Sequence, residues 1–274
     1  MTTVAFAAVP APVSAEGDVK DILARVVERA GARRQAAGRY EFTRTKATTF
    51  YKSTTEVESH DEKIYRATVD GKRTRARLIS WNGRAITNRA EAARASGNAR
   101  ARGDRTSGGD SVLKQLNDDV LKRFDFALEG KETVGGRLAW IVSVRARPGA
   151  PLRTIEDEVM ARMAGKVWVD TTEYEVAKVE MRLLRSVKIG WGGMLGALRD
   201  FQMLVERTRI AEIGWVNART DLRIDFRALL QSKRIRFNET ITNVVALPPV
   251  SPPTSRPAGR IAAESERPTD VELQ

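Results

Sequence analysis

The sequence predicts a mainly β protein of the α+β class, in which antiparallel strands form a sheet with one apolar and one charged face. In residues 165–183 (GKVWVDTTEYEVAKVEMRL), and again in residues 221–227, apolar side chains alternate with charged ones. Alternation with a period of two is typical of strands that have one side in water. Such sheets are antiparallel as a rule, and their apolar face needs a cover. The dipeptides Asp70-Gly71 and Asn82-Gly83 tolerate the positive φ of hairpin turns, so they add expected strand connections.

A first amphipathic helix is predicted over residues 18–36. Its apolar side chains recur at the i, i+3, i+4, i+7 spacing of one helix face. Asp18 is a suitable N-cap, and Gly31 and Gly38 lie where the helix could end. We expect this helix to pack on the sheet rather than on a membrane surface.

The next part of the chain reads as a meander of strands over residues 39–86, followed by a different kind of segment. Residues 88–110 are small, basic and glycine-rich, which is typical of a solvated loop. This loop has no aromatic side chain on which a nucleic-acid base could stack, so nucleic-acid binding is not favoured. A second helix is predicted from an N-cap at Asp110 to Phe124.

Strands are then predicted over residues 126–133 and 138–147, joined by a turn at Gly135-Gly136. Thr154 is expected to open a short helix whose first turn carries three consecutive carboxylates, at residues 156–158. Carboxylates are favoured at a helix N-terminus by the helix dipole, so neither acid chemistry nor a metal is needed to explain them.

The segment 190–204 (GWGGMLGALRDFQML) combines three glycines with large apolar residues. Met194, Leu195, Leu198 and Phe201 fall at helical spacing, which predicts either a short core helix under the sheet or a mobile lid. We prefer the core helix. The last strands are expected over residues 206–213, 215–229 and 234–242, and the charges that alternate along residues 221–227 are expected to form cross-strand pairs on a solvated face.

Composition limits the chemistry. The 274 residues contain no cysteine and one histidine, which excludes disulfides, thiol catalysis and most zinc sites. Glu56, Glu58, His60 and Glu62 would share a strand face and could hold a metal, although a charged strand end gives the same pattern. The nucleophile elbow, the phosphate loop and the dinucleotide fingerprint are all missing from the sequence. We therefore expect a protein that is not an enzyme and uses neither a metal nor a cofactor.

The net charge of +12 comes from 47 Lys and Arg against 35 Asp and Glu, spread over nearly every segment. A positive balance suits anionic surfaces in general, but a basic coat this diffuse is more typical of solubility than of a binding site. We expect a monomer. Residues 1–15 are interpreted as the end of an export signal, with an ordinary disordered terminus as the alternative. Residues 16–246 form the predicted domain, and residues 247–274 are a proline-rich tail predicted to be disordered.

The order of these elements, together with Gly165-Lys166-Val167-Trp168-Val169-Asp170 and the charged strand after it, resembles the periplasmic lipoprotein-carrier superfamily. These are the LolA/LolB-like proteins and their outer-membrane lipoprotein-sorting relatives, and the resemblance covers roughly Asp18 to Ala246. The basic segment 88–110 and the proline-rich tail depart from the family pattern.

The resemblance implies a curved antiparallel half-barrel with helices covering its concave face. It also implies a non-enzymatic, exported periplasmic carrier that binds lipid or lipoprotein acyl chains in an apolar cavity, with an envelope membrane protein as a further partner. Burial of hydrocarbon stabilises such a complex by ~0.8 kcal/mol per CH₂, so a carrier needs apolar area rather than reactive groups. The alternative is a non-catalytic protein-interaction or envelope-sensing module of the same fold.

The expected ligand-binding residues are apolar and lie in the predicted strands and in the glycine-rich segment. They are Trp140, Val142, Val179, Met181, Leu183, Trp191, Met194, Leu195, Leu198, Phe201, Leu222, Ile224 and Phe226. Trp168 would suit the same surface.

Overall fold

The computed structural model contains one twelve-stranded antiparallel sheet and two helices among the residues that it describes. These residues are 16–35, 38–53, 55–71, 73–88, 90–91, 122–149, 152–190, 195–229 and 231–248. The elements in chain order are α1 (Glu16–Gln35), β1 (Arg39–Tyr51), β2 (Val57–Asp70), β3 (Arg73–Trp81), β4 (Arg84–Ala85), β5 (Phe124–Val134), β6 (Arg137–Ala146), α5 (Ile155–Met160), β7 (Met163–Asp170), β8 (Val176–Leu183), β9 (Val187–Ile189), β10 (Gly196–Ile210), β11 (Gly214–Ala228) and β12 (Gln231–Ala246).

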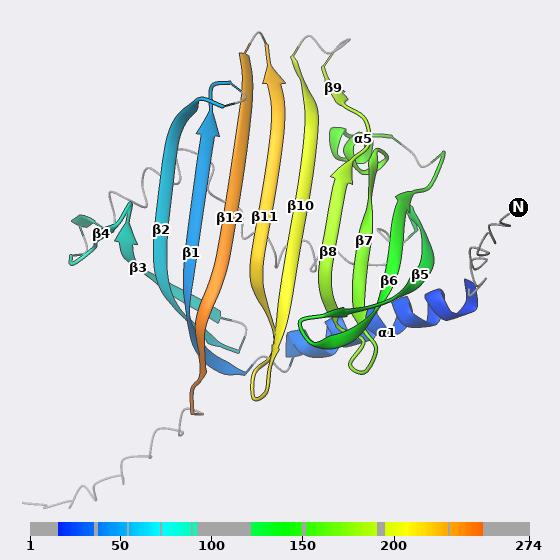
Figure 1. Cartoon of the computed structure of the whole chain (residues 1–274), viewed down its shortest axis with the longest axis horizontal. Helices are drawn as coiled ribbons and strands as arrows, with labels where there is room; N and C mark the ends of the chain where they lie inside the picture. Colours follow the sequence, from blue (N-terminus) through cyan, green and yellow to red (C-terminus); the bar gives the residue numbers. More distant parts are fainter. Residues whose placement is uncertain are drawn as a thin grey trace, which may run out of the picture.

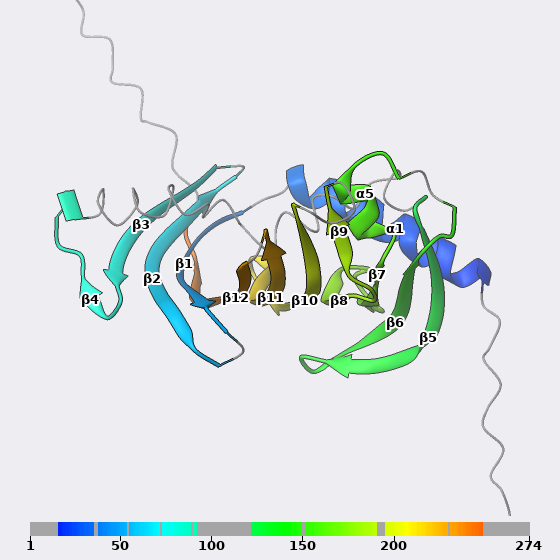
Figure 2. The same cartoon turned by 90° about the horizontal axis from the view of Figure 1, so that it is seen from above.

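The strands form two meanders, β1 to β4 and β5 to β12, which are joined side by side in one sheet (Figure 1). Their order is β4-β3-β2-β1-β12-β11-β10-β8-β7-β6-β5, with β9 beside β10, so the last strand pairs with the first and the sheet is not closed. Seen from above, the sheet curves and both helices lie on one side of it (Figure 2). We call that side the concave face and the other side the convex face. The predicted fold class, a mainly β open half-barrel with helices on its concave face, is confirmed.

Helix α1 covers β7, β8 and β10 with one apolar stripe. Ile22 and Val26 join Val169, Val179 and Val205 in one buried cluster, in agreement with the spacing that predicted the helix. The helix passes through Gly31 and ends at Gln35, close to the predicted boundary.

Arg25 adds a polar contact at the same place. Its Nη1 donates to the Tyr174 hydroxyl at 2.7 Å, and its guanidinium lies 4.7 Å from the centre of that ring. Apolar packing and this contact together hold the helix on the sheet.

Helix α5 begins as predicted, with a capping box at Thr154. The Thr154 hydroxyl accepts from the N–H of Asp157 at 3.1 Å, and the Asp157 carboxylate accepts from the N–H of Thr154 at 3.1 Å. Asp157 also pairs with Arg123. Its carboxylate therefore caps and anchors a helix.

The glycine-rich segment was predicted to contain a helix, and this prediction is wrong for its described part, because Gly196–Ile210 is strand β10. Leu198 and Phe201 are three residues apart and nevertheless pair with Phe226 and Ile224, which are two apart. A β-bulge between Leu198 and Asp200 inserts the extra residue. The bulge thus produces in a strand the spacing that is typical of a helix.

Smaller corrections concern segment ends. Phe124, expected on the second helix, is the first residue of β5, and residues 122 and 123 form a turn rather than helix. Residues 110–121 of that predicted helix lie outside the described residues. The segment around His60 belongs to strand β2, where the Thr49 hydroxyl and His60 Nδ1 are hydrogen-bonded at 2.9 Å. Within the described residues no group of three or more His, Asp or Glu side chains is arranged to hold a metal.

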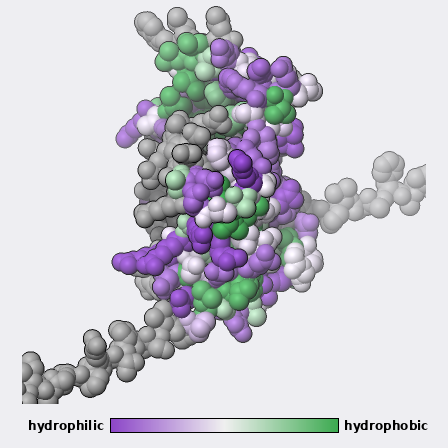
Figure 3. Space-filling model, turned by 90° about the vertical axis from the view of Figure 1, so that its left-hand side faces the viewer, coloured by the Kyte–Doolittle hydropathy of each residue, from purple (hydrophilic) through white to green (hydrophobic). Residues whose placement is uncertain are grey.

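Strand β3 forms most of one sheet edge. In the described part of the chain, β4 pairs only with Ser80 and Trp81. Arg73, Arg75 and Arg77 precede these residues, and all three are exposed on the convex side of the strand. Figure 3 looks at this edge and shows hydrophilic side chains over much of it.

At Gly165, strand β7 packs against β8 with no room for a side chain. A Cβ at this position would lie 2.0 Å from the Glu180 carbonyl oxygen and 2.5 Å from Met181 Sδ. We expect Gly165→Ala to lower the free energy of unfolding by about 2 kcal/mol, because the backbone of β8 would have to move. Urea denaturation measures this change.

Gly38→Ala is the matched control, since a Cβ added at Gly38 would meet no atom of the described residues within 4 Å and Gly38 has no positive φ. It should change stability by less than about 1 kcal/mol, and in the stabilising direction. Equal stabilities of the two variants would contradict the close packing of β7 on β8.

Candidate functional site

Strand register arranges apolar side chains of the concave face in two cross-strand rows. The first row contains Met181, Met203, Leu222 and Phe237, and the second contains Phe201, Ile224, Ile235 and Phe50. Residues opposite each other on antiparallel strands have side chains on the same face of the sheet. The rows therefore form one apolar surface that runs from β8 across β10, β11 and β12 to β1.

Burial decreases along this surface. On β6 to β8 the side chains belong to the cores beneath α1 and α5, and Val142 and Val179 are buried there. On β11, Leu222, Ile224 and Phe226 are half-buried and belong to none of the core clusters formed by described residues. The packed core thus passes into an apolar area that the described residues leave accessible.

Ten of the thirteen predicted ligand-binding residues lie on this one face. They are Trp140, Val142, Val179, Met181, Leu183, Leu198, Phe201, Leu222, Ile224 and Phe226. Leu195 lies at a bend before β10 and is 63% exposed. Trp191 and Met194 lie outside the described residues.

Trp168 is on the convex face, contrary to the prediction that it belongs to the apolar surface. Its Nε1 donates to Glu132 Oε2 at 2.7 Å, and Lys178 Nζ lies 4.4 Å from the centre of its ring. Charged neighbours therefore cover this indole.

The apolar surface ends at buried charges that sequence analysis missed. On β1, β2 and β12, Lys46 Nζ lies 3.6 Å from Glu239 Oε2, and Lys63 Nζ lies 2.8 Å from Asp61 Oδ2. The Lys63 side chain is only 4% exposed. Lysine and threonine at apolar positions of the predicted strands 39–86 are the sequence signal for this change.

No family model matches the chain, and no curated protein matches it. Solved structures do. A putative outer membrane lipoprotein-sorting protein domain from Vibrio parahaemolyticus is 12% identical, with 83% of this chain and 92% of that chain covered and a TM-score of 0.34. A LolA superfamily protein from Nitrosomonas europaea is 10% identical, with 84% and 94% covered and a TM-score of 0.31.

A DUF1329 family protein from Desulfovibrio piger is 10% identical, with 83% and 92% covered and a TM-score of 0.33. The superfamily that the sequence resembles is thus among the similar structures. Identities of this size concern the fold and assign no activity.

A second charged network holds the turn between β7 and β8, next to the start of β6. Arg137 binds Asp170 with two hydrogen bonds, Nε to Oδ2 at 2.6 Å and Nη2 to Oδ1 at 3.0 Å. The backbone N–H groups of Glu173 and Thr172 also donate to Asp170, at 2.7 and 3.0 Å. Asp170, the acidic residue that ends the strand in the family resemblance, is 1% exposed and locks a turn.

The environment of Asp170 makes stability depend on pH. Burial alone raises the pKa of this carboxyl, but the hydrogen bonds from Arg137, Glu173 and Thr172 outweigh it and leave the pKa below its ordinary value. The backbone N–H of Arg153 and the Arg123 side chain lower the pKa of Asp157 as well.

We therefore expect stability to fall as the solution is acidified. A carboxyl with a lowered pKa in the folded state contributes fully above its unfolded value of about 3.9, and the contribution is lost as the pH falls through the folded value. Urea denaturation of the wild type and of Asp170→Asn between about pH 5 and pH 2 tests this window. The variant should show a shallower dependence, and equal slopes would contradict the role of Asp170.

The described residues include no helix long and apolar enough to cross a membrane.

Proposed function

We propose that this chain is a non-enzymatic carrier of the bacterial cell envelope, located in the periplasm, that binds acyl chains of lipids or lipoproteins on the concave face of its sheet. The observation that carries the proposal is the half-buried apolar surface of Leu222, Ile224 and Phe226 on β11, where the two cross-strand rows extend beyond the packed core. An envelope membrane protein would deliver or receive the ligand.

The chemistry of this surface suits hydrocarbon. Each CH₂ removed from water stabilises a complex by ~0.8 kcal/mol, so affinity requires area rather than hydrogen bonds. The thioethers of Met181 and Met203 lie in the first row, and methionine adapts to irregular apolar shapes. The buried charges around Lys63 end the apolar surface and would limit how far a chain extends along it.

Two measurements test the proposal. Native mass spectrometry of protein purified from a membrane-containing lysate should show a co-purified lipid mass, and delipidated protein should bind palmitate saturably. A lipid-free mass together with no palmitate binding would contradict the carrier function. Saturable binding of the soluble domain of an envelope protein by such a lipid-free chain would instead support the interaction module.

A further inference from the structure

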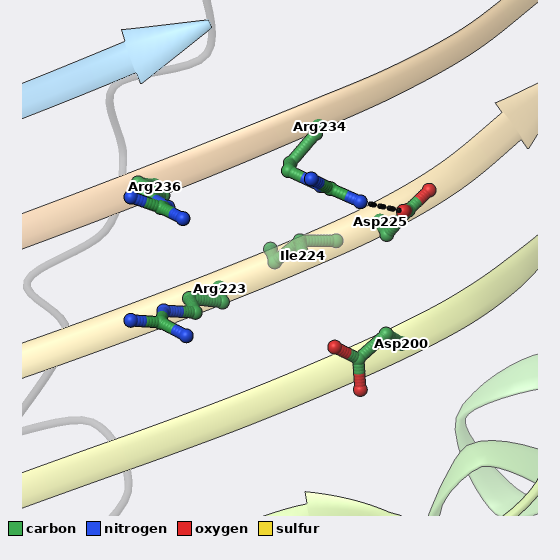
Figure 4. A pocket seen from close by; sticks show the side chains of 6 residues that line it. All are labelled: Asp200, Arg223, Ile224, Asp225, Arg234 and Arg236. Atoms are coloured by element: carbon green, nitrogen blue, oxygen red, sulfur yellow. Dashed lines mark hydrogen bonds and ion pairs between the residues drawn. The ribbon is translucent and has the colours of Figure 1, made fainter. Parts of the chain in front are cut away.

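The convex face carries a hollow of its own at the centre of the sheet. Its volume is about 210 Å³, and it opens over β10, β11 and β12 (Figure 4). Its lining residues are Asp200, Arg223, Ile224, Asp225, Arg234 and Arg236. Charged groups thus surround a recess on the side of the sheet opposite to the apolar surface.

The arginines of this hollow are not equivalent. Arg234 Nη2 donates to Asp225 Oδ2 at 3.0 Å, which is the kind of cross-strand pair that the sequence predicted. Arg223 lies directly opposite Arg236 in the register of β11 and β12, so two like charges face each other. Figure 4 shows the guanidinium groups of Arg223 and Arg236 on one side of the recess. Asp200 lies on β10, away from them.

Neither member of this arginine pair has a carboxylate partner among the described residues. Arg223 forms neither an ion pair nor a side-chain hydrogen bond within them, and Arg236 stacks on Tyr51, with its guanidinium carbon 5.3 Å from the ring centre. The Nε of Arg236 is shielded from solvent and has no hydrogen-bond partner among the described residues. Asp200 instead accepts from Gln202 Nε2, at 3.0 Å.

This arrangement has a physical consequence. Like charges directly opposite each other on neighbouring strands destabilise a sheet, and an anion between them removes that repulsion. Guanidinium is a planar fork of donors that matches the oxygens of a phosphate group, and it holds its charge at every physiological pH. The aromatic ring under Arg236 fixes the orientation of one fork in advance.

We propose that the hollow is a phosphate-binding site in which Arg223 and Arg236 donate to one phosphate group. Arg234, held by Asp225, adds positive potential beside it. The Asp200 carboxylate repels the bound anion and so weakens the affinity for phosphate. The site lies on the opposite face from the acyl-binding surface, so phosphate binding can be tested independently of the proposed carrier function.

Isothermal titration calorimetry of the full chain with inorganic phosphate at low ionic strength tests the site. The wild type should bind one phosphate saturably. Arg223→Gln and Arg236→Gln should each weaken binding by roughly tenfold or more, because a charge-assisted donor is lost. Asp200→Asn should tighten it.

Arg219→Gln is the matched control. Arg219 lies on the same strand and the same face, and its Nε is 2.6 Å from Asp221 Oδ2, so the substitution removes the same charge from a residue that already has a partner. Its phosphate affinity should stay within about twofold of the wild type, since screening by salt weakens charges at a distance.

The unfolding temperature of each variant excludes a folding defect. That of Arg223→Gln should not fall, because the substitution relieves repulsion between like charges. Absence of saturable phosphate binding to the wild type, or equal weakening by Arg219→Gln and Arg223→Gln, would overturn the proposal.

Vesicles distinguish the source of the phosphate group. Retention of the chain on phosphatidylcholine vesicles that contain phosphatidic acid, lost in Arg223→Gln and kept in Arg219→Gln, would identify a lipid headgroup. Phosphate binding without retention would identify a soluble phosphate compound. Both results support the site.

Discussion

Ile224→Glu is expected to weaken palmitate binding by roughly tenfold or more while the chain remains folded. Ile224 stands at the centre of the second apolar row, between Phe201 on β10 and Ile235 on β12. A carboxylate there would have to lose its water against hydrocarbon without gaining a partner. Fluorescence displacement of a bound fatty-acid probe by palmitate measures the loss.

Arg223→Glu is the control, because it places the same side chain one position away on the convex face. It should leave palmitate affinity within about twofold of the wild type, since alternate residues of a strand point to opposite faces. If both glutamates weakened palmitate binding alike, the ligand would not lie on the concave face.

Asp170→Ala is expected to lower the free energy of unfolding by about 3 kcal/mol, the cost of breaking a buried ion pair by removing one partner. The substitution would leave Arg137 without its bidentate partner and the N–H groups of Thr172 and Glu173 without an acceptor. The Arg137 side chain is 34% exposed, which keeps the expected loss at the low end for such pairs. Urea denaturation measures it.

Asp125→Ala removes a carboxylate from an ion pair of similar length that lies in solvent. Arg147 Nε and Asp125 Oδ1 are 2.9 Å apart, and the two side chains are 53% and 56% exposed. Exposed pairs contribute about 0–1 kcal/mol, so this variant should remain close to the wild type. A loss as large as that of Asp170→Ala would mean that burial does not determine the strength of these pairs.

Local sequence patterns were sufficient to predict several of the strands and turns. Alternation located β7, β8 and β11, and the dipeptides Asp70-Gly71 and Asn82-Gly83 do form turns, with φ of 57° at Gly71, 47° at Asn82 and 77° at Gly83. These features depend on neighbours in the chain, so the sequence contains the information directly.

The bulge in β10 could not be predicted in this way. Leu198 and Phe201 have the spacing of a helix face, and only their partners Phe226 and Ile224 on β11 show that they share a strand face. The register that inserts an extra residue is a property of two strands together.

The same reason explains the missed charges. Lys63 is buried because of the strands beside it, and Arg223 lacks a carboxylate because the residue opposite it is Arg236. Their sequence neighbours Asp61, Asp221 and Asp225 indicate ordinary solvated pairs. Cross-strand pairing, which distinguishes these sites from a solvated face, is absent from the local pattern.

The arginines of β3, which lies at an edge of the sheet formed by the described residues, have a consequence for how copies of this chain meet. A sheet edge offers unpaired backbone groups to any other strand, and proteins that keep such edges charged resist fibre growth. A second copy docking its own β3 in antiparallel register would bring Arg73, Arg75 and Arg77 against their duplicates. The mutual repulsion of six cations is a barrier to self-assembly that concentrated salt would lower.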